Sequence, residues 1–156
     1  MTTRGIPQIY YGTEILMTGT KEEGDGRLRK DFPGGWLSDT TDAFSKSGRT
    51  HMQNEAWGYL QKLLQWRKTS VAVTQGKLIH YAPRNGMYVY GRIKDNHTVL
   101  VILNGTVTDQ TLQMNRFSDL TRNYASGRDV ITSRVFDIKN TITIPAKGEY
   151  ILDLSK

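Results

Sequence analysis

The sequence predicts a mixed fold, in which one β/α unit over residues 1–72 is followed by an all-β antiparallel sandwich over residues 73–156. Three observations predict it: an apolar run at residues 6–11, helical spacing of apolar residues over 51–68, and short strand-like stretches after Gly76. A hydrophobic share of 37% supports a packed core. We therefore expect an ordered protein with two differently built halves.

Residues 6–11 have the pattern of a strand in a parallel sheet. The run lies between Gly5 and Gly12, and apart from Gln8 it is apolar on both faces. Strands of parallel sheets are covered on both faces, whereas antiparallel surface strands alternate apolar and polar residues. We expect a buried parallel strand with Tyr10 and Tyr11 pointing to opposite sides.

A long loop and a helix follow this strand. Residues 17–50 include GTKEEGDGRLRKDFPGGW and make a connection much longer than usual, and such loops are commonly functional. A helix is predicted over 51–68, with Thr50 as its N-cap and Gln53 completing a capping box. Its apolar stripe consists of Met52, Ala56, Tyr59, Leu60, Leu63 and Leu64.

From Gly76 onward the pattern is that of short strands separated by turns. An Asn-Gly hairpin signal occupies Arg84-Asn85-Gly86, a second turn is predicted at Asp95-Asn96, and a helical turn at 115–120. Strands at this frequency favour an antiparallel sandwich. The predicted strands are 77–81, 87–93, 99–104, 107–114, 130–132, 135–137, 141–144 and 150–154.

Composition argues against several classes of protein. The absence of cysteine excludes a disulfide scaffold and thiolate metal sites. The sequence has no run of about 18 apolar residues, so no membrane span is predicted. His51, His80 and His97 are isolated, so no metal site is expected, and no nucleotide-binding glycine motif indicates a cofactor. The net charge is +6, but the basic residues do not cluster, which favours a solvated surface over nucleic-acid binding.

The motif GIPQIYYGTE carries a family resemblance. Together with a Gly-Asp-Gly-Arg loop, a helix ending in LLQWRK and an all-β tail, it resembles the C-terminal part of the α-amylase superfamily, glycoside hydrolase family 13. The resemblance is closest to the neopullulanase and cyclomaltodextrinase group of the Bacteroides starch-utilisation type. It implies that the motif is the last strand of a (β/α)8 barrel, that the helix is the last barrel helix, and that the tail is the C-terminal sandwich.

The resemblance also implies an activity, an α-glucan oligosaccharide as the partner of the complete barrel, and a periplasmic or extracellular location. The family cleaves α-glucosidic bonds with retention, using three acids that follow barrel strands four, five and seven. Those strands precede this segment, and retaining chemistry needs two carboxyl groups only about 5 Å apart on one frame. We therefore expect no catalytic residue here and no hydrolase activity from this chain alone.

One acid, in Gly127-Arg128-Asp129-Val130, superficially resembles the family's nucleophile motif. The family places a residue between the arginine and the aspartate, and this copy lies in the β tail. We expect a surface turn at this position.

The long loop holds the candidate substrate-binding residues. In the related enzymes this loop places an Asp and an Arg on sugar hydroxyls, and the matching positions are Asp25 and either Arg27 or Arg29; the alternative is a surface ion pair. Phe32 and Trp36 would either stack on sugar rings or pin the loop. Tyr11 and Glu14 would either orient the sugar-contacting residues without touching the sugar themselves or anchor the loop.

Two further expectations follow. A stand-alone carbohydrate-binding sandwich is the alternative function, since Tyr81, Tyr88, Tyr90 and Tyr124 are expected to be exposed on a small β fold. An apolar strand at residues 5–11 with unpaired edges would favour a homodimer or a swapped strand in the isolated chain.

Overall fold

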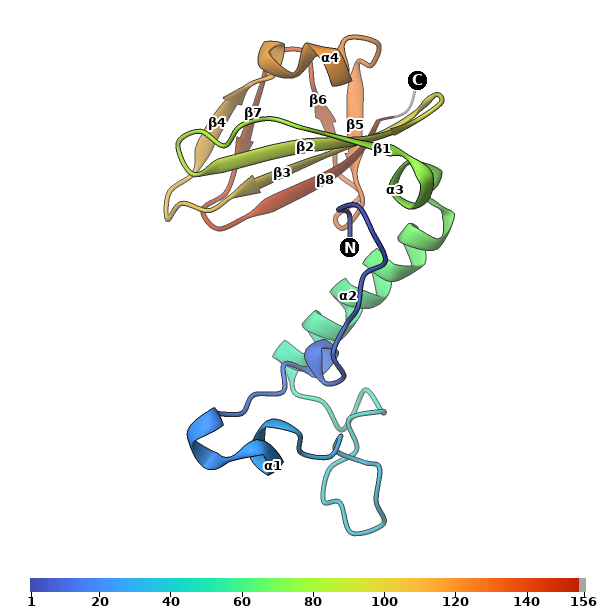
Figure 1. The fold of residues 1–156 in the computed structure, drawn as a ribbon, viewed down its shortest axis with the longest axis vertical. Coiled ribbons are helices and arrows are strands. Elements are labelled where there is room, and N and C mark those ends of the chain that lie inside the picture. Colours follow the sequence, from blue (N-terminus) through green and yellow to red (C-terminus); the bar gives the residue numbers. More distant parts are fainter. Residues whose placement is uncertain (155–156) are drawn as a thin grey trace. The chain divides into compact units, whose positions relative to one another are not determined.

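The computed structural model describes residues 1–154, which divide into two compact units (Figure 1). One unit is Ile6–Lys62, and the other joins Met1–Gly5 to the chain from Leu63 onward. This division by contacts falls within the long helix α2, His51–Thr69. The domain boundary placed after residue 72 stays a prediction.

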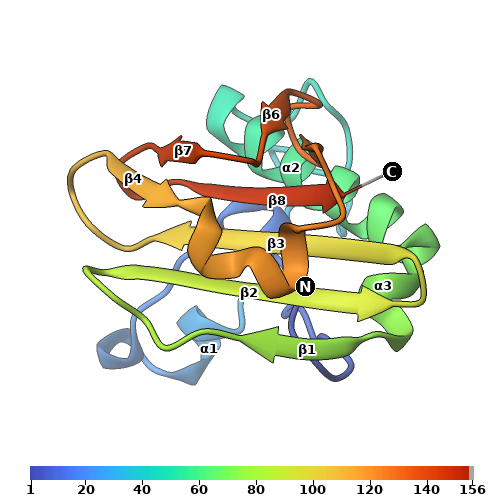
Figure 2. The same cartoon turned by 90° about the horizontal axis from the view of Figure 1, so that it is seen from above.

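An antiparallel sandwich forms most of the second unit. Its larger sheet has six strands in the order β1-β2-β3-β8-β5-β6, and its smaller sheet pairs β4 with β7 (Figure 2). Every strand pairing within residues 1–154 is antiparallel. The strands are β1 Lys77–His80, β2 Met87–Lys94, β3 His97–Asn104, β4 Gln110–Gln113, β5 Ser126–Asp129, β6 Val135–Asp137, β7 Thr141–Ile144 and β8 Glu149–Leu154.

Two hairpin turns of this sandwich lie where the sequence predicts them. Asn85 and Gly86 adopt φ of 50° and 70°, as the Asn-Gly signal requires, and Asp95 adopts φ of 53° between β2 and β3. The predicted helical turn is also confirmed, by a 3-10 helix at Met114–Phe117 and α4 at Ser118–Thr121. Local turn chemistry therefore located these turns, whereas the turns at Ser133 and Lys147, with φ of 64° and 54°, were not predicted.

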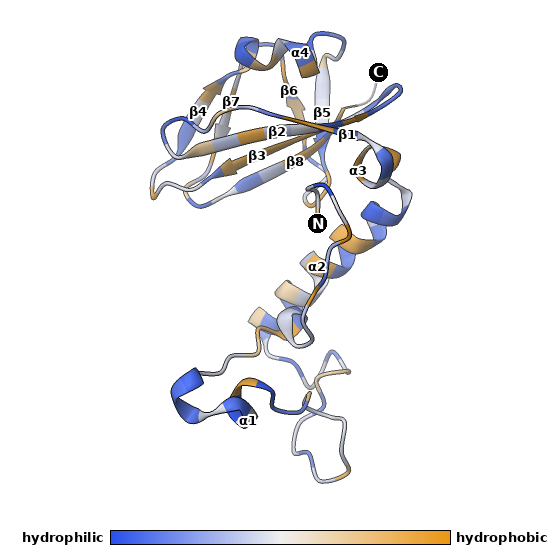
Figure 3. Ribbon diagram, viewed as in Figure 1, coloured by the Kyte–Doolittle hydropathy of each residue, from blue (hydrophilic) through white to orange (hydrophobic). Residues whose placement is uncertain are grey.

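The main core lies on one face of the larger sheet. Leu100 and Ile102 of β3 and Leu152 of β8 are fully buried there, together with Phe117. Gly91 lets α4 approach, because a Cβ at this position would lie 2.6 Å from a methyl carbon of Leu120. In Figure 3 apolar residues follow β2 and β3, whereas the short helix α1, Asp25–Leu28, is hydrophilic except at its end.

The other face of the larger sheet is also covered, which explains why β3 does not alternate. Thr98 through Ile102 are all buried. The register places Val99 opposite Arg92, and Val101 between Tyr90 and Ile151. Helix α3, Val71–Gln75, packs on β2 and β3 with Ala72 and Val73 buried. The sequence analysis did not predict α3.

Two strand predictions were wrong. Residues 6–11 form no strand, because no described strand pairs with them, and Ile6 is 98% exposed. The strand predicted at 130–132 lies instead at β5, Ser126–Asp129, where Gly127 contacts Leu152 and Leu154 of β8. A Cβ at position 127 would come within 2.6 Å of the Leu154 side chain, so the close approach of β5 to β8 favours glycine there. Strand propensity alone favours Val130, and for this reason the sequence predicted the strand at 130–132.

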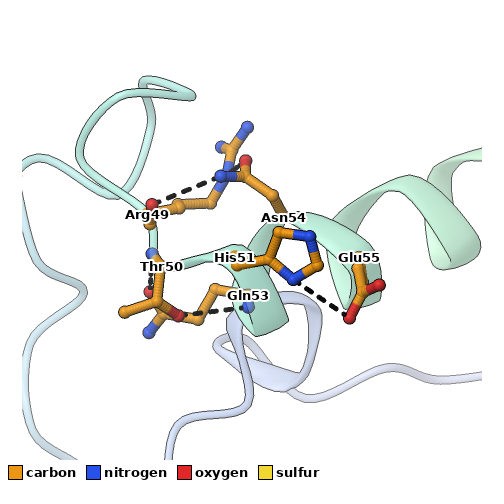
Figure 4. Close-up of polar contacts among 6 residues, drawn as sticks. All are labelled: Arg49, Thr50, His51, Gln53, Asn54 and Glu55. Carbon is orange, nitrogen blue, oxygen red and sulfur yellow. Dashed lines mark hydrogen bonds and ion pairs between the residues drawn. The ribbon is translucent and has the colours of Figure 1, made fainter.

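Helix α2 begins where the sequence predicts. The Thr50 N–H donates to Gln53 Oε1 at 2.9 Å, and the Gln53 N–H donates to Thr50 Oγ1 at 3.2 Å, which is the reciprocal capping box (Figure 4). Its apolar stripe is covered only in part, since Leu63 is the one buried residue of α2 and Met52 is exposed.

Candidate functional site

The candidate site lies in the unit Ile6–Lys62 and is organised by a turn at Gly12. Gly12 has φ of 83°, and a Cβ there would come within 2.4 Å of the Met17 sulfur, so this turn requires glycine. It leads into a 3-10 helix, Thr13–Ile15, whose Ile15 is fully buried. Glu14 lies in this short helix and is half-buried.

Tyr10 and Tyr11 lie on the same side of the chain, contrary to the prediction that they point apart. Their ring centroids are 4.7 Å apart with the rings tilted by 36°. The Tyr11 hydroxyl donates to the Lys30 carbonyl at 3.0 Å, which connects the motif to the long loop. Desolvation raises the pKa of Tyr11 above its usual value, and its side-chain hydrogen bond with Tyr10 raises it further. The alternation argument failed because the segment is not an extended strand.

These tyrosines border an open cleft of about 420 Å³. Its lining combines aromatic and aliphatic surface with two cations, contributed by Tyr10, Tyr11, Thr13, Met17, Thr18, Gly19, Leu28, Arg29 and Lys30. A mixed lining of flat apolar surface and a few hydrogen-bond donors is typical of small-ligand sites. The cleft is therefore a candidate binding site in this unit.

The two candidate arginines differ in their surroundings. Arg29 Nη2 lies 3.6 Å from Asp25 Oδ2, one helical turn away, and Arg29 also lines the cleft. Arg27 belongs to α1 but does not line the cleft. Both members of the Asp25–Arg29 pair are well exposed, so the pair itself stabilises the loop by at most about 1 kcal/mol.

The two loop aromatics do not line the cleft. Phe32 packs on Phe44 with ring centroids 4.7 Å apart, which pins the loop to itself. Trp36 is 63% exposed, and its Nε1 donates to Asp31 Oδ2 at 2.9 Å. Neither ring is among the residues that line the cleft. Tyr11 and Arg29 both line it, and Asp25 is paired with Arg29 without lining the cleft itself.

Arg49 holds the end of the loop onto α2, and the sequence analysis did not single it out. Its Nη1 donates to the Ala43 carbonyl at 2.9 Å, its Nε donates to Asn54 Oδ1 at 2.9 Å, and its guanidinium carbon lies 4.1 Å from the Trp57 ring centroid. Asn54 in turn donates to the Lys46 carbonyl at 3.0 Å. Figure 4 shows Arg49 and Asn54 side by side at the start of the helix. The sequence signal that could have indicated this role is the position of Arg49, directly before the predicted N-cap Thr50.

Asp129 is a structural residue rather than a surface-turn residue. It is 2% exposed, and its Oδ2 accepts from the Thr132 N–H at 2.8 Å and the Thr132 hydroxyl at 2.7 Å. Its Oδ1 accepts from the Ile151 N–H at 3.1 Å. The carboxylate thus closes the turn after β5, and the expectation of a surface position was wrong.

The expected exposed tyrosines of the sandwich are covered. Tyr90 and Tyr124 are buried, and Tyr81 and Tyr88 are half-buried. This removes the feature on which a stand-alone carbohydrate-binding module was predicted. Within residues 1–154 no three His, Asp or Glu side chains gather in a way that would hold a metal ion. In the same part of the chain no helix has the length and apolar character needed to cross a membrane.

Comparison with known proteins places this architecture in a family. Residues 78–153 match the family described as Cyclo-malto-dextrinase C-terminal domain. An α-amylase from Niallia circulans is 29% identical over 157 residues, which is 96% of this chain and 26% of the relative. A cyclomaltodextrin glucanotransferase from Bacillus licheniformis is 32% identical over 111 residues, or 71% of this chain and 13% of the relative.

Solved structures show the same fold. An α-amylase from Anoxybacillus superposes with a TM-score of 0.69 at 21% identity, covering 99% of this chain and 30% of that one. AmyP, determined in complex with maltose, superposes with a TM-score of 0.59 at 16% identity over 67% of this chain and 21% of its own. The chain belongs to the α-amylase superfamily of glycoside hydrolases and corresponds to a C-terminal region of its members. It spans about a quarter of the length of the α-amylase relative, at 26%.

Proposed function

We propose that this chain is the C-terminal part of a retaining α-glucan hydrolase of the α-amylase and neopullulanase type, which acts on starch, pullulan or cyclodextrin. In this proposal residues 1–72, whose segment 6–11 is not a strand in this structure, would supply the last β/α unit only in the complete barrel, and residues 73–156 form the C-terminal sandwich. The observation that supports this proposal most directly is that the motif and the matched domain belong to one continuous chain. The motif GIPQIYYGTE and its cleft lead through α2 directly into a domain that matches a cyclo-malto-dextrinase C-terminal domain.

The role proposed for the cleft is to contact sugar at the edge of the active site. Asp25 and Arg29 would hold neighbouring sugar hydroxyls by charge-assisted hydrogen bonds, and their 3.6 Å separation favours Arg29 over Arg27 for this role. Tyr10 and Tyr11 offer the flat apolar surface on which a sugar ring stacks. AmyP, which shares the fold, was determined with maltose bound.

The residues beside the cleft are assigned supporting roles in this proposal. The Tyr11 hydroxyl fixes the loop through the Lys30 carbonyl, and Glu14 lies in the adjacent 3-10 helix. Phe32 holds the loop through Phe44, and the exposed ring of Trp36 is a further stacking surface if the substrate extends beyond the cleft.

The same proposal predicts that the chain alone does not hydrolyse glucans. Asp129, the acid in the nucleophile-like sequence, is buried and accepts three hydrogen bonds. The Asp25 carboxylate pairs with Arg29 and not with a second acid. Retaining hydrolysis requires two carboxyl groups about 5 Å apart. The purified 156-residue chain should release no reducing sugar from starch or pullulan, with an intact α-amylase as the positive control. Reproducible release by this chain, unaffected by further purification, would contradict the proposal.

A further inference from the structure

A buried arginine lies on the face of the larger sheet that is opposite the main core. Arg92 of β2 is 3% exposed and pairs in register with Val99 of β3. Tyr90, two residues earlier, is buried on the same face. A charged side chain at such a position is costly unless its donors are satisfied, so the groups around Arg92 are informative.

Arg92 donates to main-chain carbonyl groups. Its Nη1 donates to the carbonyl oxygens of Thr2 at 3.1 Å and Thr3 at 2.8 Å, and its Nη2 donates to that of Gly76 at 2.8 Å. The Thr2 hydroxyl shares a hydrogen bond of 2.6 Å with the Tyr90 hydroxyl. Thr2 is itself buried, so the N-terminal segment is seated on the sheet.

A second arginine, from the last turn of α2, holds the two ends of the same segment. Arg67 Nη1 donates to the Met1 carbonyl, and Arg67 Nη2 donates to the Gly5 carbonyl at 3.3 Å. Two arginines thus bind four of the first five carbonyl groups of the chain. Gly5 has φ of 102°, so the segment ends in a turn that favours glycine before the chain continues into residues 6–11.

Electrostatics explains why carbonyl groups are the partners. Within residues 1–154 neither Arg67 nor Arg92 has a carboxylate within ion-pair distance. Burial lowers the pKa of Arg92, and the nearby charge of Arg67 lowers it further. Because an arginine stays protonated, its charge must be solvated by dipoles. Carbonyl groups of residues 1–5 and of Gly76 supply them, while Arg92 Nε is buried without a hydrogen-bond partner in the described part of the chain.

We propose that Arg67 and Arg92 form a main-chain latch, a site on the sandwich unit that recognises the carbonyl oxygens of residues 1–5 of the same chain. The latch fixes the point at which the chain enters the motif GIPQIYYGTE. Recognition is by backbone and by the small side chain of Thr2, so it tolerates changes at the exposed Thr3 and Arg4. The latch does not depend on sugar binding and stands whether or not the cleft binds sugar.

A spin label on residue 3 tests the latch directly. The chain has no cysteine, so Thr3→Cys creates a single labelling site on an exposed side chain. The label should be immobilised in the otherwise unchanged protein. Arg92→Met should release it and shorten its rotational correlation time by roughly tenfold, toward that of an unattached segment. Arg92→Lys should also release much of it, because one ammonium group cannot reproduce the fork of donors.

The matched control is Arg116→Met, on the same unit. Arg116 also donates to a carbonyl, that of Ala82 at 2.8 Å, but it is remote from residues 1–5 in the hydrogen-bond network, so its loss should leave the label immobilised. Circular dichroism verifies that each variant is folded. If Arg92→Met does not fold, the half-buried Arg67 is replaced by Met instead, with the same expected release.

Two results would overturn the latch. A folded Arg92→Met or Arg67→Met protein whose label stays immobilised would show that other contacts hold the segment. A label whose spectrum sharpens on dilution with unlabelled protein would show that two N-terminal segments lie together, as in a swapped dimer, and not each on its own chain.

Discussion

Asp129 shows how a single residue can resemble a catalytic acid and yet serve the fold. Its carboxylate accepts three hydrogen bonds, from both donors of Thr132 and from the Ile151 N–H, and it is 2% exposed. A carboxylate used in this way joins the turn after β5 to the neighbouring strand β8. With both oxygens hydrogen-bonded and the side chain buried, it is not accessible for attack on a sugar.

Replacing Asp129 with Asn should therefore destabilise the sandwich. The amide retains the size of the side chain but places an NH2 group against a donor, which leaves a buried donor without an acceptor and costs about 1–3 kcal/mol. Urea unfolding followed by far-UV circular dichroism measures this loss. The control is Asp137→Asn, because Asp137 accepts one N–H, from Lys139 at 2.7 Å, in an exposed turn. Equal stability of the two variants would contradict the structural role of Asp129.

For individual residues, the property that the sequence predicted least well was which side chains are buried. The tyrosines at positions 81, 88, 90 and 124 occur at strand or turn positions that look exposed in the sequence. Tyr81 and Tyr124 instead pack in or against the main core, and Tyr90 is buried where its hydroxyl meets that of Thr2. The Tyr90–Thr2 and Arg92–Thr3 contacts join residues that are 88 and 89 positions apart. No local pattern carries such information.

Among the elements, helix α2 has the clearest local origin. Its start is fixed by the capping box of Thr50 and Gln53, and Arg49 and Asn54 hold the preceding loop on its first turns. The sequence predicted the box because the two residues have the required types and spacing.

Thr50→Ala should weaken the start of α2 by about 1 kcal/mol, because the Gln53 N–H loses its acceptor. Amide exchange measured by NMR should show faster exchange at Gln53, by roughly fivefold, if local opening governs it. His51→Ala is the control. It removes only the His51–Glu55 contact of 3.6 Å, which is well exposed and contributes little. Unchanged exchange in Thr50→Ala would mean that tertiary contacts alone hold this turn.

Elements that depend on partners were predicted less well than elements with local signals. The hairpin turns and α2 were confirmed because their chemistry lies within a few residues. The strand predicted at 6–11 was wrong because a strand needs a neighbour, and none of the described strands pairs with it. The shift of β5 to Ser126–Asp129 has a similar cause, since its position depends on the close approach of Gly127 to β8.

For the whole molecule, the fold class was predicted in its larger part. The antiparallel sandwich and its family are established, whereas the barrel unit, the site residues and the substrate class rest on the proposal above. The candidate site was predicted only as a set of residue types on one loop. The structure adds the pairing of Asp25 with Arg29 and the cleft beside Tyr10 and Tyr11, which no spacing in the sequence specified.

The central claim is that this chain works as part of a longer α-amylase-family enzyme, and the reading frame on the 5′ side of the Met1 codon tests it most directly. The account predicts an in-frame coding region for seven further barrel strands, with an Asp, a Glu and an Asp after the fourth, fifth and seventh. The 26% coverage of the Niallia circulans α-amylase is in keeping with this. An in-frame stop codon immediately upstream, with no such region before it, would contradict the account.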